Sequence, residues 1–223
     1  MSKDCQSIVV GVLALQGDFA EHIKMLEQCG VRAIAVRYAE ELDQIDGLII
    51  PGGESTAVAK LTDEGSAPIF SAIQEKIGSM PVYGTCMGSI FLAKEIEGSS
   101  QGRLAVMDIK VKRNAFGSQR RSFESDLVIE ALGSEAFPAV FIRAPVIVEC
   151  GSSVQVLSTI DEGIVMARQN NLLVTAFHPE ITEDLRVHHY FLAMVKEYRR
   201  AQSKAAQKEC QPSGSVLEKV KLA

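Results

Sequence analysis

The stretch that decides the fold is VYGTCMGSIFLAK, residues 82–94. A short apolar run of Met80, Val82 and Tyr83 predicts a buried strand, and residues 89–97, rich in Ile, Phe, Leu and Ala, predict a helix. Between them, Cys86 has a glycine two residues away on each side, which is typical of a nucleophile elbow because larger side chains would clash in so tight a turn. The turn projects Cys86 outward, where the first helix amides can stabilise a thiolate. A buried structural cysteine is the alternative interpretation, so the remaining chain must supply a base and an oxyanion site.

Composition narrows the class of protein. The 223 residues carry a formal net charge of −5, and 47% are hydrophobic and 23% charged, as in an ordinary globular protein. Lys and Arg are scattered, so no basic stripe indicates a nucleic acid or membrane partner, and no apolar run approaches the ~20 residues of a membrane span. Five cysteines at unrelated spacings argue against a disulfide framework, and none has the spacing of a zinc site. We therefore expect a cytoplasmic protein without a metal.

The first half of the chain alternates between strand and helix patterns. Strands are predicted at residues 7–15, 31–38 and 47–50, and helices at 18–30, through Val58 and Leu61, and at 68–78. The strands are nearly continuous aliphatic runs, which are typical of strands covered on both faces. Such an alternation predicts right-handed crossovers and a parallel sheet between helices.

The second half is rich in short strand patterns at close intervals, which predict antiparallel strands adjoining the parallel sheet. A last helix is predicted from about Thr182. Together these patterns indicate the α/β class: a single Rossmann-like, flavodoxin-like three-layer domain with a mostly parallel central sheet, spanning residues 1–201. Residues 202–223 are polar, and on composition alone we expect a disordered tail there.

FHPEIT, residues 177–182, follows an apolar strand and offers a base. Pro179 favours an extended conformation at His178, and side chains two apart in an extended segment leave on the same side. His178 and Glu180 can therefore form an imidazole–carboxylate pair that completes a triad with Cys86. A lone surface histidine before a turn is the alternative.

Two further features suit a substrate site. Gly52 and Gly53, at the end of another strand, can turn a backbone amide toward a ligand, as an oxyanion hole requires. A phosphate-binding turn or a plain β-turn is the alternative. Arg113 and Arg143 are candidate clamps for a carboxylate, because a guanidinium offers a planar fork that matches it, although most arginines are solvated surface residues.

The elbow and the His-Pro-Glu segment together resemble the class I, or triad, glutamine amidotransferases. Five segments more closely resemble the glutaminase subunits of pyridoxal phosphate synthase: GVLALQGDFAEHI (11–23), GLIIPGGEST (47–56), VKRNAFGSQRRSFE (111–124), VFIRAPVI (140–147) and FHPEITEDLRVHHYF (177–191). The resemblance implies hydrolysis of L-glutamine to glutamate and ammonia for vitamin B6 synthesis. It also implies docking on a separate, barrel-shaped synthase subunit that consumes the ammonia, without a metal or an organic cofactor.

The resemblance also implies roles for individual residues. Cys86 is the nucleophile, with His178 and Glu180 as the rest of the triad. The glutamine site is lined by Gly53, Glu54, Ser55, Arg113, Ile142 and Arg143. Backbone amides of Met87 and of the Gly52–Gly53 loop form the oxyanion hole, although many relatives have a small alanine where this chain has Met87. Gln16 belongs to a loop near the oxyanion and the partner interface. His22, on the first predicted helix, is expected to be a structural or an interface residue and not a catalyst.

Three alternatives stay open. One is the glutaminase subunit that serves imidazole glycerol phosphate synthase, which the LQGDFAEH and RNAFGSQ segments disfavour. Another is a thiol hydrolase or chaperone-like protein of the same architecture, which would not need the PGGES and HPE segments together. The third, a partner-binding subunit that has lost its chemistry, is disfavoured by the intact Cys86, His178 and Glu180.

Overall fold

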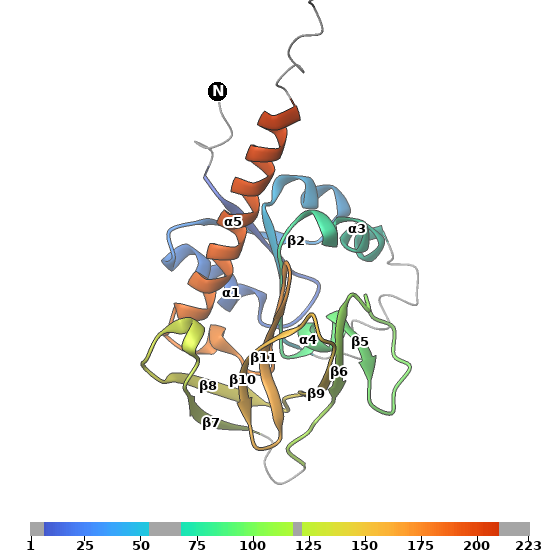
Figure 1. Ribbon diagram of the computed structural model, residues 1–223, viewed down its shortest axis with the longest axis vertical. Coiled ribbons are helices and arrows are strands. Elements are labelled where there is room, and N and C mark those ends of the chain that lie inside the picture. Colours follow the sequence, from blue (N-terminus) through green and yellow to red (C-terminus); the bar gives the residue numbers. More distant parts are fainter. Residues whose placement is uncertain (1–6, 54–67, 118–121, 210–223) are drawn as a thin grey trace, which may run out of the picture.

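The computed structural model describes residues 7–53, 68–117 and 122–209. Within these ranges the chain forms one α/β domain, in which helices cover both faces of a twisted ten-stranded sheet (Figure 1). The strand order is β2-β1-β3-β4-β12-β11-β9-β6-β5, with β10 pairing to β11, and β7 and β8 form a separate hairpin. The predicted fold class is confirmed.

The described elements have the following bounds. The strands are β1 (Val9–Leu13), β2 (Arg32–Val36), β3 (Gly47–Ile50), β4 (Val82–Thr85), β5 (Ala93–Ile96), β6 (Met107–Lys112), β7 (Ser122–Leu127), β8 (Phe137–Ile142), β9 (Val146–Cys150), β10 (Gln155–Ile160), β11 (Gly163–Gln169) and β12 (Leu172–Thr175). The α-helices are α1 (Phe19–Gln28), α3 (Pro68–Lys76), α4 (Met87–Leu92) and α5 (Arg186–Glu209). Short 3₁₀ helices are η2 (Ala39–Gln44), η3 (Ile77–Ser79), η4 (Glu130–Leu132) and η5 (Pro179–Ile181).

Strands β2, β1, β3, β4 and β12 are parallel, and β3, β4 and β12 are buried throughout, whereas the edge strand β2 is partly exposed. In β3, Leu48 and Ile50 pack into the core shared with α3 and α4, whereas Ile49 packs into the core shared with α1 and α5. Figure 1 shows α1 and α5 together on one face of the sheet and α3 and α4 on the other. This alternation explains why the strands are continuously apolar, as residues pointing either way meet a helix layer.

The predicted antiparallel strands of the second half are confirmed at β6, β9, β10, β11 and the β7–β8 hairpin. The hairpin is anchored by aromatic rings: Phe123 and Phe141 stack with their centroids 4.6 Å apart, and Phe141 also contacts Phe177 at 5.8 Å. The hairpin therefore packs against the segment that carries His178.

The helix predicted at residues 89–97 is wrong in its second half. α4 ends at Leu92, Ala93 takes an extended conformation, and residues 93–96 form β5, which pairs in parallel with β6. Ala93 and Ile96 are buried while Lys94 and Glu95 are exposed. The tertiary partner therefore overrides a local sequence that is compatible with a helix.

The predicted tail is also partly wrong. α5 continues through residues 202–209, where Ala, Gln and Lys are good helix formers, instead of ending near Arg200. Residues 210–223 and the helix expected through Val58 and Leu61 lie outside the described residues. Among the described helices, none combines the length and apolar character needed to cross a membrane.

Candidate active site

Cys86 lies on a strained turn between β4 and α4. Its φ of 46° and ψ of −104° are unusual for a residue with a side chain, and its backbone N–H donates to the Thr175 carbonyl at 2.8 Å. A Cβ at Gly88 would overlap the Ile50 carbonyl oxygen, and one at Gly84 would lie 2.6 Å from the Gly88 carbonyl group. The predicted steric reason for both glycines is confirmed.

The parallel pairing of β4 with β12 brings His178, the proposed base, to the same end of the sheet as Cys86. Thr85 and Thr175 are register partners at the ends of these strands, so the residues that follow them emerge at one sheet edge. The His178 backbone N–H donates to the Val140 carbonyl at 2.8 Å, and its Nδ1 lies 2.7 Å from Glu180 Oε1. Glu180 lies in η5, so the pair forms across a 3₁₀ turn and not along the extended segment that was predicted.

The electrostatics of this pair favour a proton on His178. Burial lowers the pKa of His178, but contacts with Asp18, Cys86 and Glu180 outweigh it and raise the pKa to about 12. Burial raises the pKa of Glu180 more than its hydrogen bond to His178 lowers it. With Nδ1 committed to Glu180, Nε2 is the nitrogen left for the thiol, and it has no in-line hydrogen-bond partner among the described residues.

The two glycine loops pack tightly beside the imidazole. A Cβ at Gly52 would lie 2.5 Å from His178 Cε1, and one at Gly17 (φ 87°) would overlap the Gly52 carbonyl oxygen. Gly53 (φ 145°) has the Gln16 side-chain amide against it. Gln16 therefore lies against the proposed oxyanion loop, while the oxyanion role of these glycines and of the Met87 amide stays a prediction.

The proposed glutamine-binding residues are only partly brought together. The Ile142 carbonyl oxygen lies 3.8 Å from Cys86 Sγ, and Arg143 follows it with a φ of 47°. Arg113 donates from Nη1 to Gln101 Oε1 at 2.8 Å. The clamp roles of the two arginines stay predictions, and Glu54 and Ser55 lie outside the described residues.

Two residues, Asp18 just before α1 and His22 within it, make contacts that the sequence did not predict. Asp18, at the start of the helix predicted over residues 18–30, makes no side-chain capping hydrogen bond and instead places Oδ2 3.5 Å from His178 Nδ1. Of the two places expected for His22, the partner interface is wrong and the structural one holds: the side chain is completely buried, with Nε2 3.3 Å from Glu180 Oε2. The signal was their spacing of four, about one helical turn, which brings both side chains to the same side at the start of α1.

We expect Asp18→Asn to lower the pKa of His178 by about one pH unit, because a carboxylate close to an imidazolium favours its charged form. The contact with His178 also lowers the pKa of Asp18, ahead of the opposing effect of burial. NMR titration of the His178 ring between neutral and alkaline pH measures the shift. Asp161→Asn, in the exposed β10–β11 turn, is the control. An unchanged titration in Asp18→Asn would exclude Asp18 from the site.

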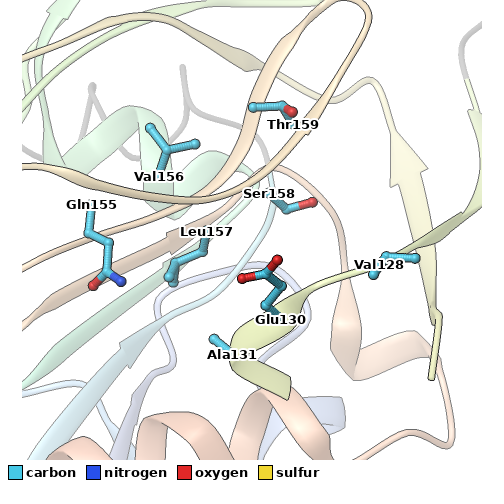
Figure 2. A pocket seen from close by; sticks show the side chains of 8 residues that line it. All are labelled: Val128, Glu130, Ala131, Gln155, Val156, Leu157, Ser158 and Thr159. Carbon is cyan, nitrogen blue, oxygen red and sulfur yellow. The ribbon is translucent and has the colours of Figure 1, made fainter. Parts of the chain in front are cut away.

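The side chains around His178 are close together, and an open cavity lies elsewhere. Potential donor atoms of Asp18, His178 and Glu180 all lie within 4.8 Å of one another. Their imidazole and carboxylate atoms already face one another, which suits proton transfer. An open pocket of about 640 Å³ lies between β10 and the η4 turn (Figure 2). Its lining includes Glu130 and Ser158 but no triad residue, so it is separate from the candidate active site.

The fold and the geometry at this sheet edge define the class of the triad glutamine amidotransferases. Residues 12–197 match the SNO glutamine amidotransferase family, and the chain belongs to that family. It is 56% identical over 187 residues to "Pyridoxal 5'-phosphate synthase subunit PdxT" of Carboxydothermus hydrogenoformans, covering 83% of this chain and 97% of the relative. The protein of the same name in Thermotoga petrophila is 48% identical, covering 84% and 99%.

Solved structures agree. A structure described as "Crystal structure of glutamine amidotransferase" is 47% identical, with a TM-score of 0.78 and coverage of 84% of this chain and 98% of that one. The structure of PurLQS from Thermotoga maritima, 16% identical, has a TM-score of 0.59 over 84% of this chain and 99% of that one. At that identity the second likeness supports the fold alone.

Proposed function

We propose that this chain is the glutaminase subunit of a pyridoxal phosphate synthase. It hydrolyses L-glutamine to L-glutamate and ammonia, and the ammonia enters vitamin B6 synthesis. The observation that carries the proposal is the 2.7 Å His178–Glu180 contact just beyond β12, the strand that pairs with β4, in a chain 56% identical to a relative named as a pyridoxal 5'-phosphate synthase subunit.

In the proposed reaction, the Cys86 thiol proton already rests on His178, and the Cys86 thiolate attacks the carbonyl carbon of the glutamine side chain. Backbone amides of Met87 and of the Gly52–Gly53 loop hold the oxyanion that forms. The His178 imidazolium then protonates the departing ammonia, which leaves a glutamyl thioester on Cys86. A water molecule deprotonated by His178 cleaves the thioester and releases glutamate.

The remaining proposed site residues hold the substrate. Arg113 and Arg143 bind its α-carboxylate, since a guanidinium matches that group. The Ile142 backbone lies against the thiol and limits where the amide can sit. Glu54 and Ser55 complete the glutamine site in this proposal.

The chain works with a partner, a synthase subunit that consumes the ammonia. We expect the rate of glutamine hydrolysis to rise at least about tenfold when that subunit is added. In this proposal, docking rotates the Gly52–Gly53 peptide so that its amide N–H can bind the oxyanion. The measurement compares glutamate release with and without the synthase subunit, and asks whether glutamine replaces ammonium as its nitrogen source. Equal rates in both mixtures would exclude activation by docking.

We also propose that the protein works in the cytoplasm. Among the described residues Cys29, Cys86 and Cys150 are all free thiols, as a reducing compartment would keep them. A thiol nucleophile likewise depends on such a compartment to stay reduced.

A further inference from the structure

Behind the candidate triad, a row of buried polar side chains leads from Glu180 into the core. Glu180 Oε1 contacts His178, whereas Oε2 has no in-line hydrogen-bond partner among the described residues. His22 Nε2 lies 3.3 Å from that Oε2 and 3.2 Å from Thr85 Oγ1. A proton on Nε2 would therefore point at Thr85 Oγ1, with Glu180 Oε2 as a second acceptor at a more bent angle. On the other side of the ring, His22 Nδ1 lies 3.0 Å from His188 Nε2 of α5.

Both histidines of the row are neutral. Burial, followed by the charges of His188 and His178, holds the pKa of His22 well below its usual value. Burial, followed by the charge of His189, lowers the pKa of His188 to about 4. Each ring therefore carries one proton and offers one donor and one acceptor nitrogen.

The contacts favour one of the two tautomeric arrangements. If His22 carries its proton on Nδ1, its Nε2 lone pair faces the carboxylate lone pairs of Glu180, and His188 must hold an N–H on Nδ1, which has no partner among the described residues. If the proton is on Nε2, it faces the carboxylate, and Nδ1 accepts from His188 Nε2–H. The second arrangement leaves only an acceptor unpaired and avoids the lone-pair repulsion.

We propose that His22, oriented by His188, is a positioning residue that donates to Glu180 Oε2 and keeps this carboxylate ionised and aimed at His178. The two oxygens of Glu180 would then each face one imidazole, the catalytic one on Oε1 and the supporting one on Oε2. Catalysis by the triad is part of the proposed function, on which this inference rests. The His22–Glu180 interaction itself can be tested without glutamine turnover.

Other titratable groups also face this carboxylate. They are His178 at its first oxygen, the Asp18 carboxylate before α1, and Tyr83 of β4, whose hydroxyl bonds to Thr175 Oγ1 at 2.9 Å. All three groups are retained when His22 or His189 is replaced. Their effects therefore cancel when variants are compared at the same pH.

The test compares His22→Leu, which removes the donor, with His22→Gln, which keeps an N–H donor. Iodoacetamide alkylation of Cys86 is followed by mass spectrometry of its peptide as a function of pH. In His22→Leu we expect the midpoint on the acidic side of this pH profile of Cys86 alkylation to rise by about one pH unit. The reason is that Glu180 is protonated more easily when the His22 N–H donor is missing. At a pH below the midpoints of both the wild type and His22→Leu, alkylation of the variant should then be roughly tenfold slower than that of the wild type. His22→Gln should keep the wild-type midpoint, and so should His189→Leu on the exposed side of α5.

A uniform loss of rate with an unmoved midpoint in His22→Leu would overturn the proposal, as would an equal shift in His22→Gln. ¹⁵N NMR of the imidazoles in the wild-type protein provides a second test that no folding defect can obscure. We expect a neutral His22 protonated on Nε2 at pH 7, and a proton on Nδ1 would exclude the donor role. A wild-type protein that fails to hydrolyse glutamine yet shows these results would refute the proposed function and leave the inference standing.

Discussion

Cys86→Ala is expected to lower glutamine hydrolysis by about 10³-fold or more, to the background rate, because no other group in the proposed mechanism can form the glutamyl thioester. The fold should survive, since alanine tolerates the φ of 46° about as well as cysteine does and the Cys86 backbone bond to Thr175 is retained. The measurement is glutamate release in the presence of the synthase subunit, together with the thermal unfolding midpoint of the variant alone.

The matched control is Cys150→Ala, which removes an exposed thiol on β9 and should leave hydrolysis unchanged. Turnover retained in Cys86→Ala would refute the assignment of the nucleophile. A fall in both variants would point instead to a general requirement for reduced thiols.

Gly88→Ala is expected to lower the free energy of unfolding by about 3 kcal/mol or more, because the new methyl group would overlap the Ile50 carbonyl oxygen. That atom belongs to the backbone of β3 and cannot rotate away, so α4 must move off the sheet. The shift would also displace Cys86, at the start of α4, and hydrolysis should be lost even where the variant folds. Urea denaturation and glutaminase assays measure the two effects.

Gly78→Ala provides the comparison for this steric argument. Gly78 is exposed after α3, and a Cβ there meets nothing within 4 Å. We expect its stability to stay within about 0.5 kcal/mol of wild type. Equal stability losses in the two variants would mean that glycine is needed at residue 88 for reasons other than contact with β3.

Much of the fold could be predicted because strand burial leaves a direct mark on sequence. Residues 47–50 are apolar without a break because both faces of β3 are covered, and Gly84 and Gly88 mark the elbow through steric exclusion. The β5 strand was missed because its four residues are compatible with a helix. Its pairing with β6 depends on a segment that comes later in the chain.

The candidate site was predicted where a motif is local and missed where it is assembled from distant elements. His178 and Glu180 are two residues apart, so their pairing could be expected. The contact of His22 with Glu180 depends on how α1 packs under the sheet, which the LQGDFAEH segment does not reveal. The same holds for His188, which lies on α5 and meets His22 only in the folded core.

The position of β12 between β4 and β11 has a consequence for biosynthesis. This strand leaves the ribosome after the other described strands, yet it fills the middle of the sheet. Until β12 pairs with β4, the edge of β4 that it covers has no partner strand, and His178, which follows β12, is not yet beside Cys86. In the proposed mechanism the growing polypeptide therefore carries an inert thiol, and insertion of one short strand both closes the sheet and supplies the base.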